Sequence, residues 1–235
     1  MIKKNKIIAF IPAKKNSQGL ENKNLKKLNG IALFEIAILN AKKSKFIDEI
    51  YLSSDSNLIL NRANKLKINT IKRKKSLCKN DSTADSVILD FIKNYLIKEK
   101  ESNEDCIIIY LQPTSPFRSD QHIDKAIKLF LKNKLSILIS MNENKNFFKS
   151  FKLKNNIANS IFNTKYVTKN RQNLKKIYSP NGAIYIFYAN EFLKNKKINF
   201  TNSGYYKMSK INSIDIDDKE DYELAKELSK KYLKT

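Results

Sequence analysis

The chain has 235 residues, 41% hydrophobic and 29% charged, so it can bury the core of one folded domain. Its formal net charge of +23 comes from lysines scattered through every segment, without a helix-turn-helix, RRM or zinc-finger pattern, which argues against nucleic acid as the main partner. No apolar run approaches the ~20 residues of a membrane helix. Cys78 and Cys106 form neither a disulfide framework nor a CxxC metal site, so we expect a cytoplasmic protein without membrane insertion.

The amino-terminal stretch 7–30 predicts a strand followed by a cation-rich loop. Residues 7–11 are a short apolar run bounded by Pro12, which is typical of a buried strand. The loop that follows is neither a Walker loop nor a GxGxxG fingerprint, because Gly19 stands alone. Its cationic and amide side chains suit a polyphosphate bound at the carboxyl end of a parallel strand. These side chains include Lys14, Lys15, Asn16, Ser17, Lys23 and Asn24.

Helices and strands are expected to alternate through the next segments. The residues 53–56, Ser-Ser-Asp-Ser, either cap the following helix or face a nucleotide. A basic loop follows at 73–80, and Asp81 or Ser82 is expected to cap the next helix. The expected helices are 31–43, 57–66 and about 81–100, and the expected strands are 48–52, 69–72 and 105–111.

The run 105–111 is the clearest strand, because it is continuously apolar like a central strand covered on both faces. It leads into the polar and proline-rich segment 112–118, and a helix at 120–132 and a strand at 135–141 follow. His122, the only histidine, is expected to be a surface or capping residue. This alternation predicts an α/β fold with a largely parallel sheet.

The regular alternation ends at about residue 142. Residues 142–173 are rich in Asn, Lys and Phe without a clear period, so we expect an excursion with short strands. Its aromatic side chains serve either a dimer contact or a local core. They are Phe147, Phe148, Phe151, Phe162 and Tyr166.

The carboxyl-terminal part predicts a turn, a strand and an acidic pair. We expect a turn at 179–182 and a strand at 183–188. If the segment before the last helix is extended, Asp215 and Asp217 share one face. Two carboxylates beside a polyphosphate loop are suitable ligands for Mg²⁺. The remaining expected elements are a short helix at 190–194, an extended piece at 205–208 and a helix at about 219–233.

Five stretches in this order resemble the cytidylyltransferases that activate sialic acid and its relatives legionaminate and pseudaminate. They are IPAKKNSQGLENKNL, YLSSDS, LQPTSPFRS, RQN with SPNGAIYIF after it, and MSKINSIDIDDKEDYELA. The resemblance implies a single domain over 1–235 with the doubly wound fold of nucleotide-diphospho-sugar transferases. It implies a homodimer in which the extension at about 142–173 contributes to dimerisation. It also implies a reaction of CTP with a nonulosonic acid to give a CMP-sugar and pyrophosphate.

The same resemblance implies roles for particular residues. The sugar hydroxyl would attack the α-phosphorus of CTP directly, and Arg171 would bind the sugar carboxylate. The implied catalytic residues are Lys14, Lys23, Asp215 and Asp217, of which Asp215 and Asp217 would hold Mg²⁺. The implied CTP-binding residues are Ser17, Asn24, Arg73 and Ser82. The implied sugar-binding residues are Gln112, Thr114, Ser115, Lys149, Arg171, Gln172 and Asn181.

Two positions depart from the family pattern. Lys14 stands where the family usually has Arg, and Gln18 stands where it usually has Lys. Lys14 keeps the charge without the planar fork of arginine, and Lys15 is a candidate to compensate for Gln18. We expect either a lower activity or a rearranged grip on the triphosphate.

Three other interpretations compete with this one. A ketodeoxyoctonate cytidylyltransferase would share the fold and chemistry but typically lacks Gln-Pro-Thr-Ser-Pro at the end of the central strand. A nucleic-acid-binding protein is suggested by the net charge alone. A catalytically silent partner would keep the fold without turnover.

Overall fold

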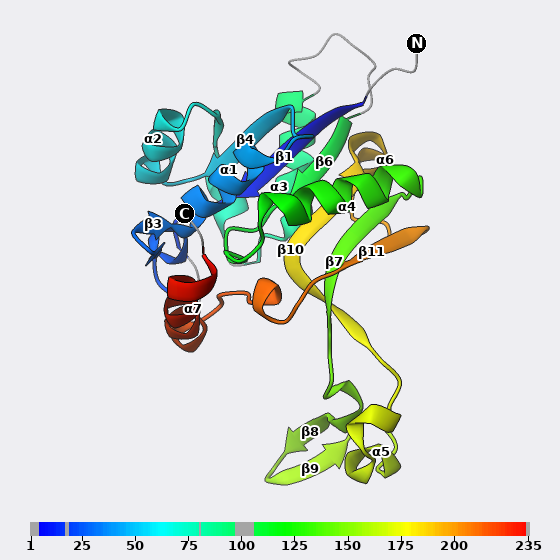
Figure 1. Ribbon diagram of the computed structural model, residues 1–235. Helices are drawn as coiled ribbons and strands as arrows, with labels where there is room; N and C mark the ends of the chain where they lie inside the picture. The colour runs from blue at the N-terminus through cyan, green and yellow to red at the C-terminus, as the bar shows by residue number, and fades with distance from the viewer. Residues whose placement is uncertain (1–4, 17–18, 80, 97–105, 234–235) are drawn as a thin grey trace.

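The computed structural model describes residues 5–16, 19–79, 81–96 and 106–233 (Figure 1). Within these residues a seven-stranded sheet has the order β11-β7-β10-β6-β1-β4-β5. Its strands are β1 (Lys6–Pro12), β4 (Glu49–Ser54), β5 (Asn69–Lys72), β6 (Cys106–Tyr110), β7 (Ile137–Glu143), β10 (Tyr178–Tyr188) and β11 (Ser203–Lys207). β10 runs antiparallel to both neighbours and the other pairs are parallel, so the predicted mostly parallel sheet is confirmed.

Helices cover both faces of the sheet, as a doubly wound fold requires. Alternate side chains of a strand point to opposite faces, so Ile7, Ala9 and Ile11 enter one core while Ile8 and Phe10 enter the other. This explains why the central strands are continuously apolar. The first core is covered by α1 (Leu33–Lys43), α2 (Asn57–Lys65) and α4 (Asp120–Lys132), and the second by α3 (Ala84–Phe91) and α6 (Ala189–Asn195).

The strand order reverses between β1 and β6. The chain moves outward from β1 to β4 and β5, and it then returns to β6 on the other side of β1. Ligands of open α/β sheets bind beyond the carboxyl ends of the strands at such a reversal. The loops that follow β1 and β6 are therefore the expected walls of a site.

Most predicted elements coincide with observed ones. The predicted strand 69–72 and helix 120–132 have the bounds of β5 and α4. At the start of α4, Ser119 Oγ accepts a hydrogen bond from His122 N, and Ser119 N donates to His122 Nδ1 at 3.0 Å. The prediction of a surface or capping role for His122 is therefore confirmed. The end of the helix predicted at 81–100 lies outside the described residues.

Two predictions near helix starts were wrong. Ile31 and Ala32 do not begin a helix; they form β3 (Ile31–Ala32), which pairs with β2 (Lys27–Leu28). The cap of α3 is neither Asp81 nor Ser82 but Thr83, whose hydroxyl accepts a hydrogen bond from Ser86 N at 3.2 Å. The helix therefore starts at Ala84, one or two residues later than a cap at Ser82 or Asp81 would place it, because the Thr83 side chain is the one that reaches Ser86 N.

The predicted turn at 179–182 lies inside β10. Gly182 has a φ of +76°, which glycine adopts readily, and the register with β7 shifts between Pro180 and Tyr185. The turn residues therefore produce an irregularity within one long strand rather than its start.

The predicted excursion forms an arm that projects from the body between β7 and β10 (Figure 1). It contains the hairpin β8 (Phe151–Lys154) and β9 (Ile157–Ser160) and the short helix α5 (Lys165–Thr168). Four of the five aromatic side chains contact one another, with ring centroids 4.9 to 5.7 Å apart, but none of the four is buried. These are Phe147, Phe148, Phe162 and Tyr166. The contacts favour the local-core alternative, and the dimer contact stays a prediction.

The last helix, α7 (Lys219–Tyr232), returns the chain to the amino-terminal region. Asn29 Nδ2 donates to Ser229 O at 2.9 Å, and Leu28, Ile216 and Ala225 share one apolar cluster. This packing places the acidic segment before α7 beside the loop after β1. Among the described helices, none is both long and apolar enough to cross a membrane.

Candidate active site

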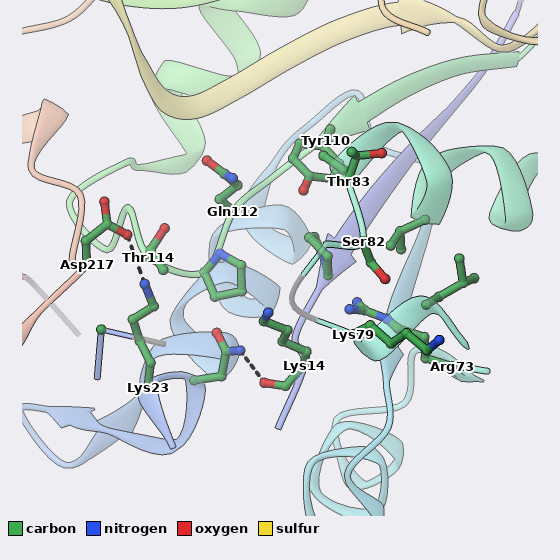
Figure 2. A pocket seen from close by; sticks show the side chains of 17 residues that line it. Lys14, Lys23, Arg73, Lys79, Ser82, Thr83, Tyr110, Gln112, Thr114 and Asp217 are labelled. Atoms are coloured by element: carbon green, nitrogen blue, oxygen red, sulfur yellow. Dashed lines mark hydrogen bonds and ion pairs between the residues drawn. The ribbon is translucent and has the colours of Figure 1, made fainter. Parts of the chain in front are cut away.

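A cavity of about 490 Å³ opens at the carboxyl ends of β1 and β6 (Figure 2). Its walls come from the loops after these two strands, the basic loop before α3, the start of α3 and the segment before α7. This is the place that the reversal of strand order indicates. Eight of the residues predicted for the site line it: Lys14, Lys23, Asn24, Arg73, Ser82, Gln112, Thr114 and Asp217.

An ion pair inside this cavity joins the loop after β1 to the segment before α7. Lys23 Nζ donates to Asp217 Oδ1 at 3.0 Å, although the residues are 194 positions apart (Figure 2). The Lys23 side chain is 11% exposed and that of Asp217 is 76% exposed. A predicted phosphate-binding lysine thus lies in contact with a predicted metal ligand.

Close packing holds the lysine loop against the acidic segment. A Cβ atom on Gly19 would lie 2.3 Å from the carbonyl oxygen of Asp217, so this approach requires glycine. Within the loop, Asn24 Nδ2 donates to Lys14 O at 2.8 Å, and Asn24 is 5% exposed. Asn24 therefore shapes the loop through the main chain of Lys14. Ser17 lies outside the described residues.

Asp215 lies deeper than Asp217. Ile216 N donates to Thr114 O at 2.9 Å, which ties the acidic segment to the loop after β6. Burial raises the pKa of the Asp215 carboxyl, a hydrogen bond with the Thr114 side chain opposes this pKa shift, and the charge of Asp217 adds to it. The two carboxylates are thus close neighbours with different environments, whereas the sequence pattern placed them on one face.

The donor set of the acidic pair fits Mg²⁺. Asp215 Oδ1 is buried and has no hydrogen-bond partner within the described part of the chain. Asp217 lines the cavity. Mg²⁺ is usually held by one or two carboxylates, with phosphate oxygens and water completing its shell. The described residues contain no group of three or more His, Cys, Asp or Glu side chains that could hold a metal.

A buried arginine lies behind the acidic pair. The Arg118 guanidinium is 1% exposed, and its Nη1 donates to the carbonyl oxygens of Gln112 at 3.0 Å and Ala183 at 2.8 Å. Burial lowers the pKa of Arg118 to about 10, and the charge of Asp215 opposes that decrease, so the guanidinium is protonated at neutral pH. Arg118 holds together the loop after β6 and the irregular part of β10. Ser115, predicted to bind sugar, is fully buried and does not line the cavity.

The other end of the cavity is built around Arg73. Its Nε donates to Ser53 Oγ at 3.2 Å and its Nη2 to Ser53 O at 2.9 Å, and the residue is 6% exposed. Ser82 Oγ donates to Ser76 O. The capping alternative for the Ser-Ser-Asp-Ser segment is confirmed, because Ser56 accepts from Ile59 N as the cap of α2. Ser53 orients Arg73, and the nucleotide-facing alternative stays a prediction.

A second cavity of about 560 Å³ adjoins the first. Ala84, Tyr110 and Gln112 line both cavities. The remaining lining mixes aromatic, aliphatic and polar side chains, namely Asp85, Tyr185, Lys197, Ile198, Asn199 and Phe200. Gln112, which was predicted to face the sugar and the nucleotide, is therefore at the junction of two spaces.

Ser115 and three further predicted sugar-binding residues, Lys149, Gln172 and Asn181, do not line these cavities. Lys149 and Arg171 belong to short 3₁₀ turns of the arm, and Gln172 follows Arg171. Asn181 is 6% exposed, and its amide is used within the fold: Nδ2 donates to Ser213 Oγ at 2.8 Å, and Oδ1 accepts from Ser140 Oγ at 2.6 Å. The contacts of Asn181 thus give it a structural role in the fold, and its sugar contact stays a prediction.

Sequence reasoning missed Tyr110, Lys79 and Thr83 as lining residues. Tyr110 was hidden within an apolar run, but a signal was available. It precedes Gln112 by two positions, and residues two apart on an extended segment point to the same side.

The fold and the site together define a doubly wound α/β protein in which a lysine loop meets an acidic pair at the reversal of strand order. Residues 8–234 match the sequence profile of the cytidylyltransferase family, and the chain belongs to that family. The resemblance seen in the sequence is thereby confirmed.

Two curated relatives and one solved structure illustrate the match. The N-acylneuraminate cytidylyltransferase of Escherichia coli O18:K1:H7 (strain RS218 / NMEC) is 31% identical over 222 residues, which cover 94% of this chain and 51% of that protein. The CMP-N,N'-diacetyllegionaminic acid synthase of Campylobacter jejuni subsp. jejuni serotype O:2 is 29% identical over 223 residues, which cover 93% of each. The chain thus spans about half the length of the N-acylneuraminate enzymes it matches and nearly all of the Campylobacter relative. A CMP:2-keto-3-deoxy-manno-octonic acid synthetase complexed with CTP shares the fold, with a TM-score of 0.68 at 12% identity over 96% of this chain and 99% of that chain.

Proposed function

We propose that this protein transfers the cytidylyl group of CTP to a nonulosonic acid and releases pyrophosphate. The observation that carries the proposal is the ion pair between Lys23 and Asp217 in the cavity at the strand reversal, in a chain of the cytidylyltransferase family. The acceptor is inferred from the relatives, whose names specify an N-acylneuraminate and a diacetyllegionaminic acid. The ketodeoxyoctonate alternative is supported by a likeness of fold alone.

In this proposal the triphosphate lies along the lysine loop. Lys14 and Lys23 would bind its oxygens and stabilise the charge that develops on the departing pyrophosphate. The cytidine would lie towards Arg73 and Ser82 at the other end of the cavity. The contribution of Ser17 stays a prediction from the resemblance.

Asp215 and Asp217 would hold Mg²⁺ beside the triphosphate. When bound, this ion would neutralise phosphate charge and lower the pKa of the attacking hydroxyl. The hydroxyl oxygen would form a bond to the α-phosphorus while the bond to pyrophosphate breaks. Such a displacement depends mainly on positioning and charge stabilisation, which the fixed loop at Gly19 and the buried Arg118 support.

The sugar would lie at the junction of the two cavities, where Gln112 faces both. The predicted sugar contacts Lys149, Arg171 and Gln172 belong to the arm, which projects away from the body of its own chain (Figure 1). We therefore propose a homodimer in which the arm of one chain reaches the sugar site of the other. A cytoplasmic location belongs to the same proposal.

The decisive experiment measures pyrophosphate release from CTP and Mg²⁺ with four acids offered separately. N-acetylneuraminate, legionaminate, pseudaminate and ketodeoxyoctonate are each tested with and without EDTA. EDTA-sensitive release with one of the first three acids is expected and would identify the acceptor. Release with ketodeoxyoctonate alone would indicate a ketodeoxyoctonate cytidylyltransferase. No release with any of the four acids, from a folded protein that binds CTP, would indicate a catalytically silent partner.

The nucleic-acid alternative has its own test. Binding to random-sequence DNA or RNA is measured between low and high salt, where use of the net charge would produce a steep fall in affinity. We expect only weak binding at physiological salt, because the lysines are distributed over the whole sequence.

A further inference from the structure

Tyr110 is the last residue of β6 and the place where the two cavities meet. It is 6% exposed, yet it lines both the cavity that holds the lysine loop and the cavity that contains Tyr185. Figure 2 shows its hydroxyl pointing into the space beside Gln112. A buried aromatic residue thus presents one polar atom to the junction.

The hydroxyl group is arranged as a donor. The Gln112 side chain lies beside it with the amide nitrogen turned towards the hydroxyl (Figure 2), and this amide favours the phenolate. The amide oxygen Oε1 lies on the other side, since a Cβ on Gly182 would be 2.5 Å from it. Burial raises the pKa of Tyr110 to about 12, so the hydroxyl keeps its proton at neutral pH. The hydroxyl proton is therefore available for an acceptor in the cavity.

The ring that carries this hydroxyl is held on both sides. Its centroid lies 6.2 Å from that of Phe10 in a tilted contact and 6.0 Å from that of Tyr185 in an edge contact. Phe10 in turn stacks on Phe91 at 4.3 Å. A donor fixed in this way loses little freedom when a ligand binds.

We propose that Tyr110 is a specificity-determining residue whose hydroxyl donates a hydrogen bond to a hydroxyl or acyl oxygen of the acceptor sugar. The sugar is favoured over the nucleotide because Tyr110 also lines the second cavity, where its ring contacts Tyr185. Lys14, Lys23, Arg73 and Ser82, which are proposed for CTP, line the first cavity and not the second. This inference rests on the proposed function.

The test is the variant Tyr110→Phe, which keeps the ring and removes the donor. With the acid that the wild-type protein uses best, we expect the sugar KM to rise about three- to tenfold, the value of one neutral hydrogen bond. The dissociation constant of CTP, measured by calorimetry without sugar, should stay unchanged. The matched control is Tyr51→Phe, because Tyr51 belongs to the same apolar cluster and its hydroxyl contacts Glu49 rather than either cavity.

The same substitution in a Gln112→Met protein separates a direct contact of Tyr110 with the sugar from an effect that acts through Gln112. If Tyr110 binds the sugar itself, Tyr110→Phe should still raise the sugar KM when Gln112 is replaced by Met. An unchanged sugar KM in both backgrounds would overturn the inference, as would an effect present only with Gln112 intact or one confined to CTP affinity. Failure of the wild-type protein to release pyrophosphate with any acid would instead reject the proposed function, and this inference with it.

Discussion

At the scale of single residues, Lys23 and Asp217 show how positive and negative side chains are arranged in the site. Each lies in the cavity, and each neutralises the other at 3.0 Å. Asp215 is held deeper, where burial raises its pKa, and the positive charge of Arg118 lies behind it. The exposed carboxylate is therefore the one that phosphate and metal would meet first.

Replacing Asp217 by Asn should remove a metal ligand while keeping the shape of the side chain. We expect turnover to fall about 100-fold or more, comparable to the loss of one charge-stabilising group in other enzymes. Pyrophosphate release is the measurement, and thermal unfolding should be nearly unchanged because Asp217 is exposed.

Asp218→Asn is the matched control for this change. Asp218 Oδ1 accepts a hydrogen bond from Asp221 N as the cap of α7, and Asn caps helices as well as Asp does. It removes the same charge one position away. Equal losses of turnover in the two variants would contradict a specific role for Asp217.

Gly182 matters to the site because it has no side chain. Its φ is +76°, and a Cβ there would lie 2.5 Å from Gln112 Oε1 and 3.0 Å from Asp215 Oδ2. Gly182→Ala should therefore cost stability of about 1 to 3 kcal/mol from backbone strain and also displace two predicted site residues. Denaturant unfolding and steady-state kinetics measure the two effects separately.

Gly30 provides a control with the same backbone strain. Its φ is +83°, and a Cβ there would meet nothing within 4 Å. Gly30→Ala should lose stability to a similar extent while keeping its sugar KM and turnover. Normal kinetics in Gly182→Ala would show that Gln112 and Asp215 are positioned in some other way.

At the scale of elements, α4 carries a cap that depends on pH. His122 accepts from Ser119 N, and its Nε2 lies 3.1 Å from Asn212 Nδ2. Burial lowers the pKa of His122, with further lowering from the charges of Lys125 and Arg118. The folded protein thus favours the neutral ring more than the unfolded chain does.

This pKa shift sets the direction of a pH effect on stability. The unfolded chain binds the proton at the ordinary pKa of 6.5 and the folded chain only at a lower pH. The contribution of His122 is therefore complete above pH 6.5 and is lost as the pH falls through that value. In His122→Gln, which keeps an acceptor for the capping box, unfolding midpoints should depend less on pH in this window. Identical pH profiles for the two proteins would contradict the assignment.

The elements also show which parts of the fold the sequence could predict. β6 and α4 were found because an apolar run and a capped amphipathic period are local signals. The residues of β10 before Ala183 were mistaken for a turn, because a positive-φ glycine inside a strand has the same local composition. Tyr110 was missed because an aromatic residue at the end of an apolar run resembles a core residue, although its spacing of two from Gln112 was a usable signal.

The contacts within the site, unlike the helices and strands, could not be predicted from local sequence signals. No periodicity connects residues 194 positions apart, so the contact of Lys23 with Asp217 could be anticipated only from resemblance to a family. The same resemblance assigned Asn181 to the sugar, whereas its packing against Ser140 and Ser213 depends on tertiary structure. Arg118 was part of a recognised motif, but only its burial shows what it holds.

At the scale of the whole molecule, the arm is the part whose structure is least accounted for by contacts within its own chain. Its aromatic cluster is internally packed, while Phe151, Leu153 and Ile157 on the hairpin are exposed to 42%, 77% and 61%. Exposed apolar side chains on a projecting hairpin are suited to contact with a second chain. This supports the proposed exchange of arms.

Two inactive variants can test the exchange. In a heterodimer of Asp217→Asn with Arg171→Ala, one complete site forms only if an arm reaches the partner chain. Differently tagged chains are co-expressed, the heterodimer is isolated, and its pyrophosphate release is compared with that of each variant alone. We expect activity to reappear in the heterodimer, and its absence would place each arm at its own site.

The pairing of Lys23 with Asp217 also has a consequence for biosynthesis. A chain emerging from the ribosome acquires the lysine loop and both central strands β1 and β6 early, but the acidic pair follows only after residue 214. Growing chains can therefore form much of the cavity before the proposed metal ligands are synthesised. The proposed reaction would then require a polypeptide that has been synthesised beyond Asp217.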